Sequence, residues 1–195
     1  MNNRLQELIE AIKKLEKELA EELDRKQEEF FYRIRDGRIR FDREVKRRHQ
    51  ALVTNIGRYL FTAETRNILT APLIWFCLIP ALFLDLVVTV FQAVCFRVYK
   101  IPRVPRHRFI VIDRTALSYL NGIEKMNCAY CGYFNGLIAY VQEVAARTEQ
   151  YWCPIKHAKP QGSYHSRYKN FLEYGDALGY KEKLESIRRD FSDLE

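Results

Sequence analysis

Apolar residues recur in different patterns along the chain, and each pattern predicts a different kind of segment. Near the amino terminus, leucine and isoleucine alternate at spacings of three and four residues, which is the seam of a heptad repeat. Beyond residue 23 the spacing becomes eleven residues, a period that favours a straighter or right-handed supercoil. The seam residues are Leu5, Leu8, Ile12, Leu15 and Leu19, and the eleven-residue series is Leu23, Ile34, Val45 and Ile56.

Together these patterns predict one long helix in residues 1–66, a coiled-coil or amphipathic stalk whose second half is basic. Gly37, which follows Asp36, is the most favourable place for a break, because glycine weakens a helix by about 1 kcal/mol relative to alanine. A heptad seam needs a partner stripe but does not specify whose. We expect a homo-oligomer through residues 5–56, with packing of the helix against its own chain as the alternative.

The middle of the chain predicts a membrane segment in residues 67–99. Asp85 and Arg97 are the only charged residues between Ile68 and Val98, and about 20 apolar residues suffice to cross a bilayer as a helix. Two topologies are open: a single kinked span, or a helical hairpin with arms 71–84 and 86–98. We favour the hairpin, because both flanks are basic and the positive-inside rule then places both on the cytoplasmic side. Each arm would be only ~21 Å long, which suggests that the hairpin enters without crossing.

Asp85 stands near the centre of this apolar run, where a carboxylate is costly. It could serve as a proton or ion site, or pair polar groups between protomers. We prefer a structural role, a turn residue that reaches a polar partner or water, since no second acidic or basic group lies beside it in the run.

The last third predicts a small helical domain in residues 109–195, joined through a basic, proline-punctuated linker at 100–108. Residues 109–113 have the composition of a short strand. The spacing of apolar residues then predicts helices over 116–126 and 137–152, and two short helices in the tail. Glu143 and Arg147, four residues apart, suggest a surface ion pair. The whole chain is therefore expected to be mainly α.

Cysteine and histidine supply the one chemical motif of the chain. Cys128 and Cys131 form a Cys-x2-Cys pair, and Cys153 and His157 form a Cys-x3-His pair. Three thiolates and one imidazole are a standard tetrahedral zinc site. The pairs meet only if residues 132–136, which begin with Gly132, run extended, because an unbroken helix would separate Cys131 from Cys153 by ~33 Å. Otherwise the pairs join between two chains, or they are unrelated and Cys-x2-Cys is a redox pair or two buried thiols.

Short stretches around these residues resemble known metal sites. Cys128-x2-Cys131-Gly132-Tyr133 and Trp152-Cys153-Pro154 are similar to the two knuckles of rubredoxin, which implies iron and electron transfer as an alternative to zinc. The histidine in the fourth position departs from that pattern. The order of stalk, apolar run, Cys-x2-Cys and WCPIKH is similar to a family of uncharacterised bacterial membrane proteins, which implies membership of the cell envelope and no activity.

Charge is distributed in blocks along the 195 residues. The net charge is +7, and the positive excess lies in residues 33–66 (+6) and 97–114 (+5), on both sides of the apolar run. Lys and Arg in these flanks suit anionic membrane lipids, and we expect no nucleic acid as a partner. The amino terminus lacks the apolar region of a signal peptide. We expect the bulk of the chain to be cytoplasmic at the inner (plasma) membrane.

The function expected from these features is that of a membrane-anchored, non-enzymatic, metal-stapled assembly or scaffold protein. No catalytic residue is assigned. The alternative is a membrane-associated redox or electron-transfer protein that uses Cys128, Cys131, Cys153 and His157 with iron, or the Cys-x2-Cys dithiol alone.

Overall fold

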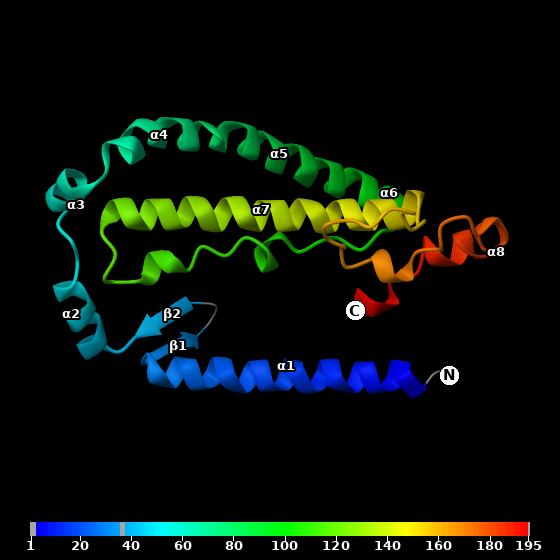
Figure 1. The fold of residues 1–195 in the computed structure, drawn as a ribbon, viewed down its shortest axis with the longest axis horizontal. Coiled ribbons are helices and arrows are strands. Elements are labelled where there is room, and N and C mark those ends of the chain that lie inside the picture. The colour runs from blue at the N-terminus through cyan, green and yellow to red at the C-terminus, as the bar shows by residue number, and fades with distance from the viewer. Residues whose placement is uncertain (1–2, 36–37, 195) are drawn as a thin grey trace. The chain divides into compact units, whose positions relative to one another are not determined.

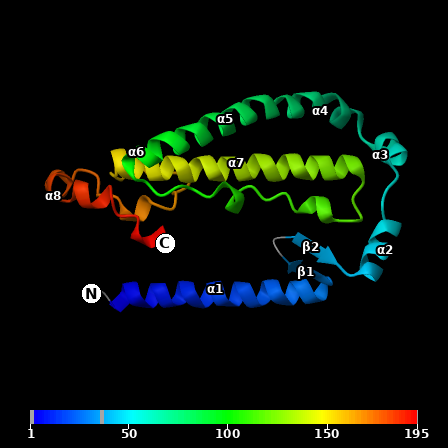
Figure 2. The same cartoon turned by 180° about the vertical axis from the view of Figure 1, so that it is seen from behind.

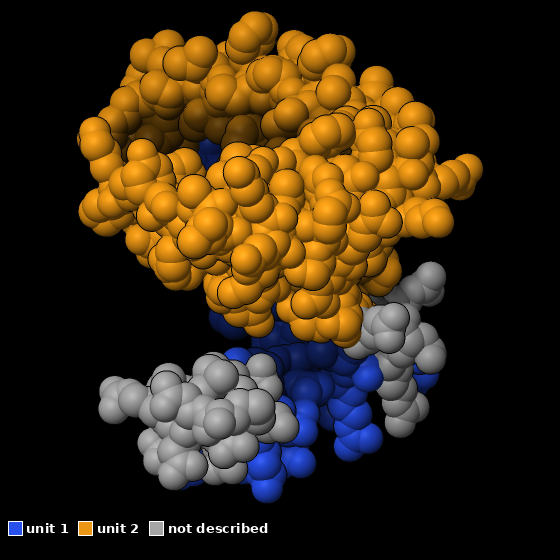
Figure 3. All heavy atoms as spheres, turned by 90° about the vertical axis from the view of Figure 1, so that its right-hand side faces the viewer, with its two compact units in different colours: residues 1–62, 113–126 blue, residues 63–112, 127–195 orange. Residues whose placement is uncertain are grey.

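The computed structural model describes residues 3–35 and 38–194. The protein is mainly helical, with 68% helix and little sheet, which confirms the expected fold class at that level. The chain divides into two compact units, which are coloured separately in Figure 3. Unit 1 comprises residues 1–62 and 113–126, and unit 2 comprises residues 63–112 and 127–195.

Unit 1 begins with helix α1 (Asn3–Glu29) and continues with a β-hairpin, not with the predicted helix to residue 66 (Figure 1). Strands β1 (Tyr32–Arg35) and β2 (Arg38–Phe41) pair antiparallel. Phe31, between α1 and β1, has a φ of 54°, a conformation that ends a helix. Helices α2 (Arg43–Ala51) and α3 (Ile56–Thr62) follow.

The hairpin replaces the helix because the local sequence also alternates with period two. Ile34 pairs with Ile39 and Tyr32 with Phe41, so their side chains share one face of the hairpin. The rings of Tyr32 and Phe41 lie 5.9 Å apart. The break predicted at Gly37 falls on residues 36–37, outside the described residues, but an Asp-Gly pair between alternating segments is itself a strong hairpin signal.

Unit 2 contains one nearly continuous apolar helical segment, Thr65–Tyr99, which is long and apolar enough to cross a membrane. We call it the apolar helix. It consists of α4 (Thr65–Phe76), α5 (Leu78–Phe91), a π-helical turn (Gln92–Phe96) and α6 (Arg97–Tyr99).

A proline accounts for the one interruption between α4 and α5. Pro80 has no N–H to donate to the carbonyl of Phe76, and its ring crowds that carbonyl. The helical hydrogen bonds resume one residue later, where the Ala81 N–H donates to the Cys77 carbonyl (3.3 Å). The predicted hairpin with arms 71–84 and 86–98 is therefore wrong: Asp85 lies inside α5 and not at a turn.

The apolar helix ends in a left-handed residue, and the chain then reverses. Lys100 has a φ of 57°, and the Ile101 N–H donates to the Phe96 carbonyl (2.9 Å), the six-to-one bond of a Schellman motif. Residues 101–112, which we call the return segment, then run back without regular structure except for a 3-10 turn at Arg106–Arg108. The strand predicted at 109–113 is not formed.

Helix α7 (Gly122–Trp152) is one uninterrupted helix where two were predicted. Its start is set by a capping box: the Glu124 N–H donates to Asn121 Oδ1 (3.0 Å), and the Asn121 N–H donates to Glu124 Oε2 (2.8 Å). The helix predicted from residue 116 is therefore delayed to residue 122, and residues 114–116 form only a 3-10 turn.

After α7 the chain makes an isolated bridge between Ile155 and Leu172 and ends in α8 (Ala177–Ile187) and a 3-10 turn. In both views of the ribbon, α4, α5 and α6 run alongside α7 in the same chain direction (Figures 1 and 2). The core of unit 2 lies where the apolar helix, the return segment, α7 and the carboxyl-terminal turn meet. Its buried members are Ala81, Phe96, Ile101, Val104, Leu137, Tyr140, Val144 and Phe191.

Candidate functional site

The four residues predicted to bind a metal are divided between two places on α7. Cys128 and Cys131 lie in the first third of the helix, whereas Cys153 and His157 follow its carboxyl end. All three cysteines are free thiols. His157 is exposed, and its backbone N–H donates to the Tyr168 hydroxyl (2.9 Å).

One unbroken helix keeps the two pairs apart, since Cys131 and Cys153 are ~33 Å from each other along its axis. Within the described residues, no group of three or more His, Cys, Asp and Glu side chains is placed to hold a metal ion. The four-ligand site predicted for zinc, or alternatively for iron, is therefore not assembled within one chain.

The Cys-x2-Cys pair also lacks the geometry of a ready dithiol. Cβ atoms three residues apart on a helix are about 5–6 Å from each other, whereas a disulfide needs a Cβ–Cβ distance of about 3.5–4.5 Å. Oxidation of Cys128 and Cys131 would therefore require α7 to distort.

Gly132, expected to form the tight loop of a metal knuckle, instead lies inside α7 and packs against the return segment. A Cβ at Gly132 would lie 3.0 Å from the Val111 carbonyl oxygen. One turn later, a Cβ at Gly136 would lie 2.5 Å from the Phe109 carbonyl oxygen and 2.8 Å from the Ile110 Cα. These two glycines let the backbone of the return segment rest directly on the helix.

Asp85 is the centre of a polar bridge between the apolar helix, the return segment and α7. Arg106 makes a two-pronged contact, with Nη2 donating to Oδ2 (2.6 Å) and Nε donating to Oδ1 (3.1 Å). The hydroxyl of Tyr133, on α7, donates to Oδ2 (2.9 Å), and the hydroxyl of Thr89, one turn along α5, donates to Oδ1 (3.3 Å).

This bridge satisfies a carboxylate that would otherwise be buried at a high cost. Asp85 is 8% exposed, and a buried charge is tolerated when it is paired and its oxygens are hydrogen-bonded. The hydrogen bonds that Arg106 donates to the Asp85 carboxylate raise the pKa of Arg106 above its ordinary value, more than burial lowers it. Asp85 was expected to be a turn residue that reaches a polar partner or water. It lies inside α5 instead, and its partners come from α5 itself, from the predicted basic linker and from α7.

Gln92 forms a second clamp one to two turns further along the apolar helix. Its Oε1 accepts from the Val104 N–H (2.6 Å), and its Nε2 donates to the Tyr140 hydroxyl (2.9 Å) and, more weakly, to the Val104 carbonyl (3.4 Å). Gln92 begins the π-helical turn, and a widened turn of this kind is often found where a helix supports a special side-chain contact. Gln92 thereby provides hydrogen-bond partners for the N–H and carbonyl groups of Val104, which lies in neither a helix nor a strand.

Sequence interpretation did not identify this clamp, although the polar residues carry a signal. Asp85, Thr89 and Gln92 are spaced by four and three residues inside an apolar run, so they fall on one helix face. Such a polar stripe predicts a buried contact with another segment, but the identity of that segment is not encoded in the spacing.

Buried arginines anchor the other side of α7. Arg147 donates to Glu143 Oε1 (2.8 Å) and to the carbonyls of Pro102 (2.8 Å) and Arg103 (3.2 Å). With side chains 7% and 12% exposed, Arg147 and Glu143 are a buried pair and not the predicted surface pair.

Arg167, which is fully buried, joins α7 to the carboxyl-terminal turn. It donates from Nη1 to both carboxylate oxygens of Asp193 (2.7 and 2.8 Å), and from Nε to the side chain of Gln150. Hydrogen bonds therefore hold unit 2 together where a metal staple was expected.

The opposite side of the apolar helix is an exposed, uncharged surface. Only 6% of its most apolar window is buried. The residues that are covered recur every three or four positions, from Ala71 through Asp85 to Phe96, and the rest of the circumference is open. We call this surface the apolar face. Its large exposed members are Ile68, Leu69, Leu73, Ile74, Phe76, Ile79, Leu82, Phe83, Leu84, Leu86, Val87, Val90, Phe91, Val94 and Val98.

A shallow, open depression lies at the edge of this face, lined by Leu82, Asp85, Leu86, Thr89 and Arg106. The Arg106 side chain is 45% exposed there, so a ligand that contacts Leu82 and Leu86 can also contact the guanidinium. The arrangement joins an apolar surface to a cationic rim, and this juxtaposition is the feature of unit 2 that is best suited to a binding role.

No family model, no curated protein and no solved structure matches the chain. The likenesses to rubredoxin knuckles and to a family of bacterial membrane proteins therefore stay predictions from short motifs.

Proposed function

We propose that the protein is a membrane-anchored assembly protein, with the apolar helix as its anchor and α1 as its contact with further copies. The apolar face is the observation that supports the anchor. Monomeric soluble proteins seldom expose a contiguous apolar patch of more than a few hundred Å², whereas this face continues along the whole helix without a charged residue from Ile68 to Leu84 and again from Leu86 to Phe96.

The charges on both sides of the helix support the choice of membrane. Arg58 and Arg66 precede Ile68, and Arg97, Lys100 and Arg103 follow Phe96, all of them exposed. Cationic side chains at the ends of an apolar segment favour the anionic cytoplasmic leaflet. We therefore place the protein at the plasma membrane, with most of the chain in the cytoplasm.

The assembly role derives from the heptad seam of α1. Leu15 and Leu19, which belong to this seam, are 64% and 60% exposed in the single chain, and Leu23, the first residue of the eleven-residue series, is 53% exposed. Glu16 and Glu18 flank the seam in the sequence, and ion pairs join Lys14 to Glu18 (3.8 Å) and Lys17 to Glu21 (3.6 Å). A leucine seam with charged flanks is typical of helices that pair with a second copy.

Vesicle flotation of the full-length protein tests the anchor. The double variant Leu73→Asp/Phe83→Asp places two charges on the apolar face, at positions that are 69% and 68% exposed. We expect it to remain at the bottom of the gradient while the wild type floats. The matched control is Tyr174→Asp/Leu178→Asp, at positions 69% and 75% exposed but outside the apolar helix, which should float like the wild type. Equal flotation of all three proteins would refute the anchor.

Sedimentation of the solubilised protein tests the assembly role separately. The variant Leu15→Asp/Leu19→Asp should sediment as a smaller species than the wild type and still float with vesicles. An unchanged mass would mean that α1 does not mediate self-association.

A further inference from the structure

We propose that the apolar helix does not cross the bilayer but lies along one leaflet, with the apolar face in the acyl layer and the return segment at the anionic headgroups. This orientation rests on the membrane attachment proposed above and specifies its geometry. The partner is one leaflet of an anionic lipid bilayer, and the protein would be monotopic, with both ends of the helix on the same side.

The length of the apolar face is the first observation against a crossing helix. From Ile68 to Phe96 the helix is ~43 Å long, whereas the hydrocarbon core of a bilayer is about 30 Å thick. To keep the whole face in hydrocarbon, a crossing helix would have to tilt by roughly 45°, which is beyond the usual range of about 0–40° for membrane-spanning helices. A helix that lies in the leaflet meets no such limit.

The return segment is the second and stronger observation. Arg106 is joined to Asp85, in the middle of the apolar helix, at 2.6 Å. The next two residues, His107 and Arg108, are exposed at the same turn. A crossing helix would carry these groups into the bilayer core, where exposed cationic side chains are expensive and rare.

The backbone of the return segment leads to the same conclusion. Residues 110–112 are in neither helix nor strand, and Val111 is exposed. Lipid-exposed irregular backbone does not occur within the hydrocarbon region. At the surface of a leaflet, this segment lies outside that region.

The exposed stripe of α7 is mixed where it runs beside the apolar helix. Tyr133 lies at the level of Asp85, and Tyr140 lies at the level of Gln92. Close to these levels, Asn135, Ile138 and Gln142 are exposed. Unit 2 therefore presents a continuous apolar surface along one helix and a mixed surface along the other, as expected of a protein lying at an interface.

Charge complementarity selects the lipid. Arg97, Lys100, Arg103, Arg106 and Arg108 are exposed within the last turn of the apolar helix and the return segment. Basic residues near a membrane surface are attracted by anionic headgroups over about a Debye length. The same leaflet thus provides acyl chains for the apolar face and phosphates for this basic rim.

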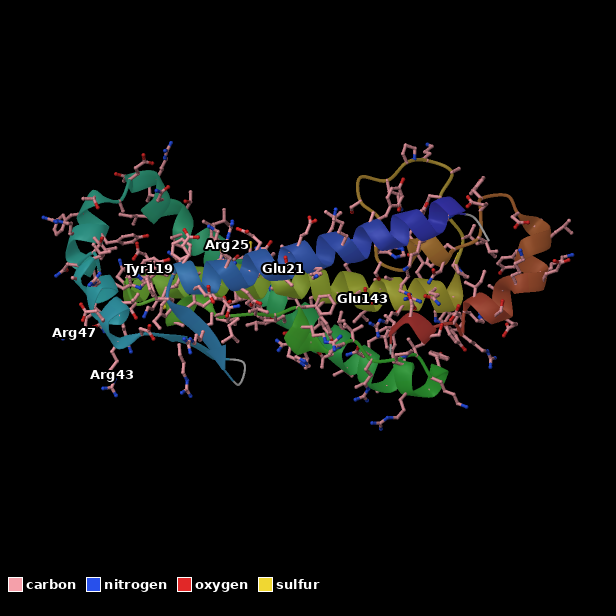
Figure 4. The ribbon with its side chains drawn as sticks, turned by 90° about the horizontal axis from the view of Figure 1, so that it is seen from below. Glu21, Arg25, Arg43, Arg47, Tyr119 and Glu143 are labelled. Atoms are coloured by element: carbon pink, nitrogen blue, oxygen red, sulfur yellow. The ribbon has the colours of Figure 1, made fainter. Side chains whose placement is uncertain are left out.

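A double-cysteine variant tests the orientation in single molecules. Arg47→Cys/Arg108→Cys, in a full-length background whose five native cysteines are replaced by serine or alanine, is reconstituted into phosphatidylcholine vesicles with one phosphatidylglycerol in three lipids. Arg47 lies on α2, ahead of the apolar helix, and is exposed (Figure 4). A membrane-impermeant maleimide is added outside, and intact mass spectrometry counts the labels per molecule.

A helix along one leaflet predicts molecules with two labels or none, because both positions lie on one side. A crossing helix predicts at most one label per molecule until detergent is added, because Arg108, two residues from the Arg106 that binds Asp85, would then lie in the bilayer core or on the far side; that result would overturn the proposal. Phe83→Cys, on the apolar face, is the matched control and should stay unlabelled until detergent is present.

Trypsin treatment of wild-type vesicles is independent of the cysteine-free background. The proposed orientation predicts a membrane-retained fragment cut at both ends, between Arg66 and Arg108. Fragments that always keep one uncut flank would contradict it. Failure of the wild type to float with vesicles would instead refute the membrane anchor itself, so the two proposals fail in distinguishable ways.

Discussion

Gly136 offers the sharpest test of how the return segment packs on α7. In the variant Gly136→Ala, the new methyl group would lie 2.5 Å from the Phe109 carbonyl oxygen and 2.8 Å from the Ile110 Cα. Both neighbours are backbone atoms, so relief requires the return segment to move and not merely a side chain to rotate. Overpacking of this kind costs about 1–3 kcal/mol, and we expect the upper end of that range here. The better helix propensity of alanine offsets about 1 kcal/mol, which leaves a net loss of about 2 kcal/mol.

Thermal unfolding of the full-length protein in micelles, followed by circular dichroism, measures this loss. For a chain of this size, a loss of about 2 kcal/mol lowers the Tm by about 4–8 °C. Gly132→Ala, with a single contact at 3.0 Å, should cost less. Gly162→Ala, where a Cβ would meet nothing within 4 Å, should leave the Tm unchanged. If Gly136→Ala were as stable as Gly162→Ala, the close approach of the return segment to α7 would be refuted.

Three further predictions concern the clamp, the ion pair and the cysteines. Gln92→Leu removes three hydrogen bonds and leaves the buried Val104 N–H without its partner, so we expect a loss of about 2–3 kcal/mol in chemical unfolding; an unchanged midpoint would mean that this clamp contributes nothing. Arg106→Met should destabilise the protein more than Asp85→Asn. Arg106→Met leaves the buried Asp85 carboxylate without its cation, whereas Asp85→Asn leaves a half-exposed guanidinium that water can reach. The reverse order of stability would contradict the assigned burial of Asp85. Cys153→Ser should not change the zinc content of purified protein by elemental analysis, because its sulfur is remote from the Cys-x2-Cys pair; loss of bound zinc would show that the two pairs share a site, as between two chains.

Local signals in the sequence explain which elements were predicted well. The apolar run over residues 67–99 was located correctly because its composition alone makes it helical and apolar, although the favoured hairpin with arms 71–84 and 86–98 was wrong. The hairpin in unit 1 was missed although its signal, alternation of apolar and polar residues, is local. Ile34 also belongs to the eleven-residue series, and that series predicted a helix through the same residues. The capping box at Asn121 and Glu124 was likewise legible, and it would have placed the start of α7 correctly.

The candidate metal site shows why motif spacing was insufficient. Whether Cys131 and Cys153 meet depends on the conformation of the residues between them, and those residues are compatible with a loop or a helix. Gly132 and Gly136 made an extended path over residues 132–136 possible, which a shared metal site required. In the folded protein their lack of a side chain serves close packing against Phe109 and Val111, and the helix is retained.

By itself, the sequence determined the mainly helical character of the protein, the position of its apolar helix and the basic charge on both sides of it, because composition and periodicity act locally. The tertiary structure decided what Asp85, Gln92 and Arg147 do. Each of them has a partner on the return segment, which reaches them only because the chain reverses at Lys100. The free energy gained by pairing a buried polar group depends on this contact in space and not on the distance along the sequence.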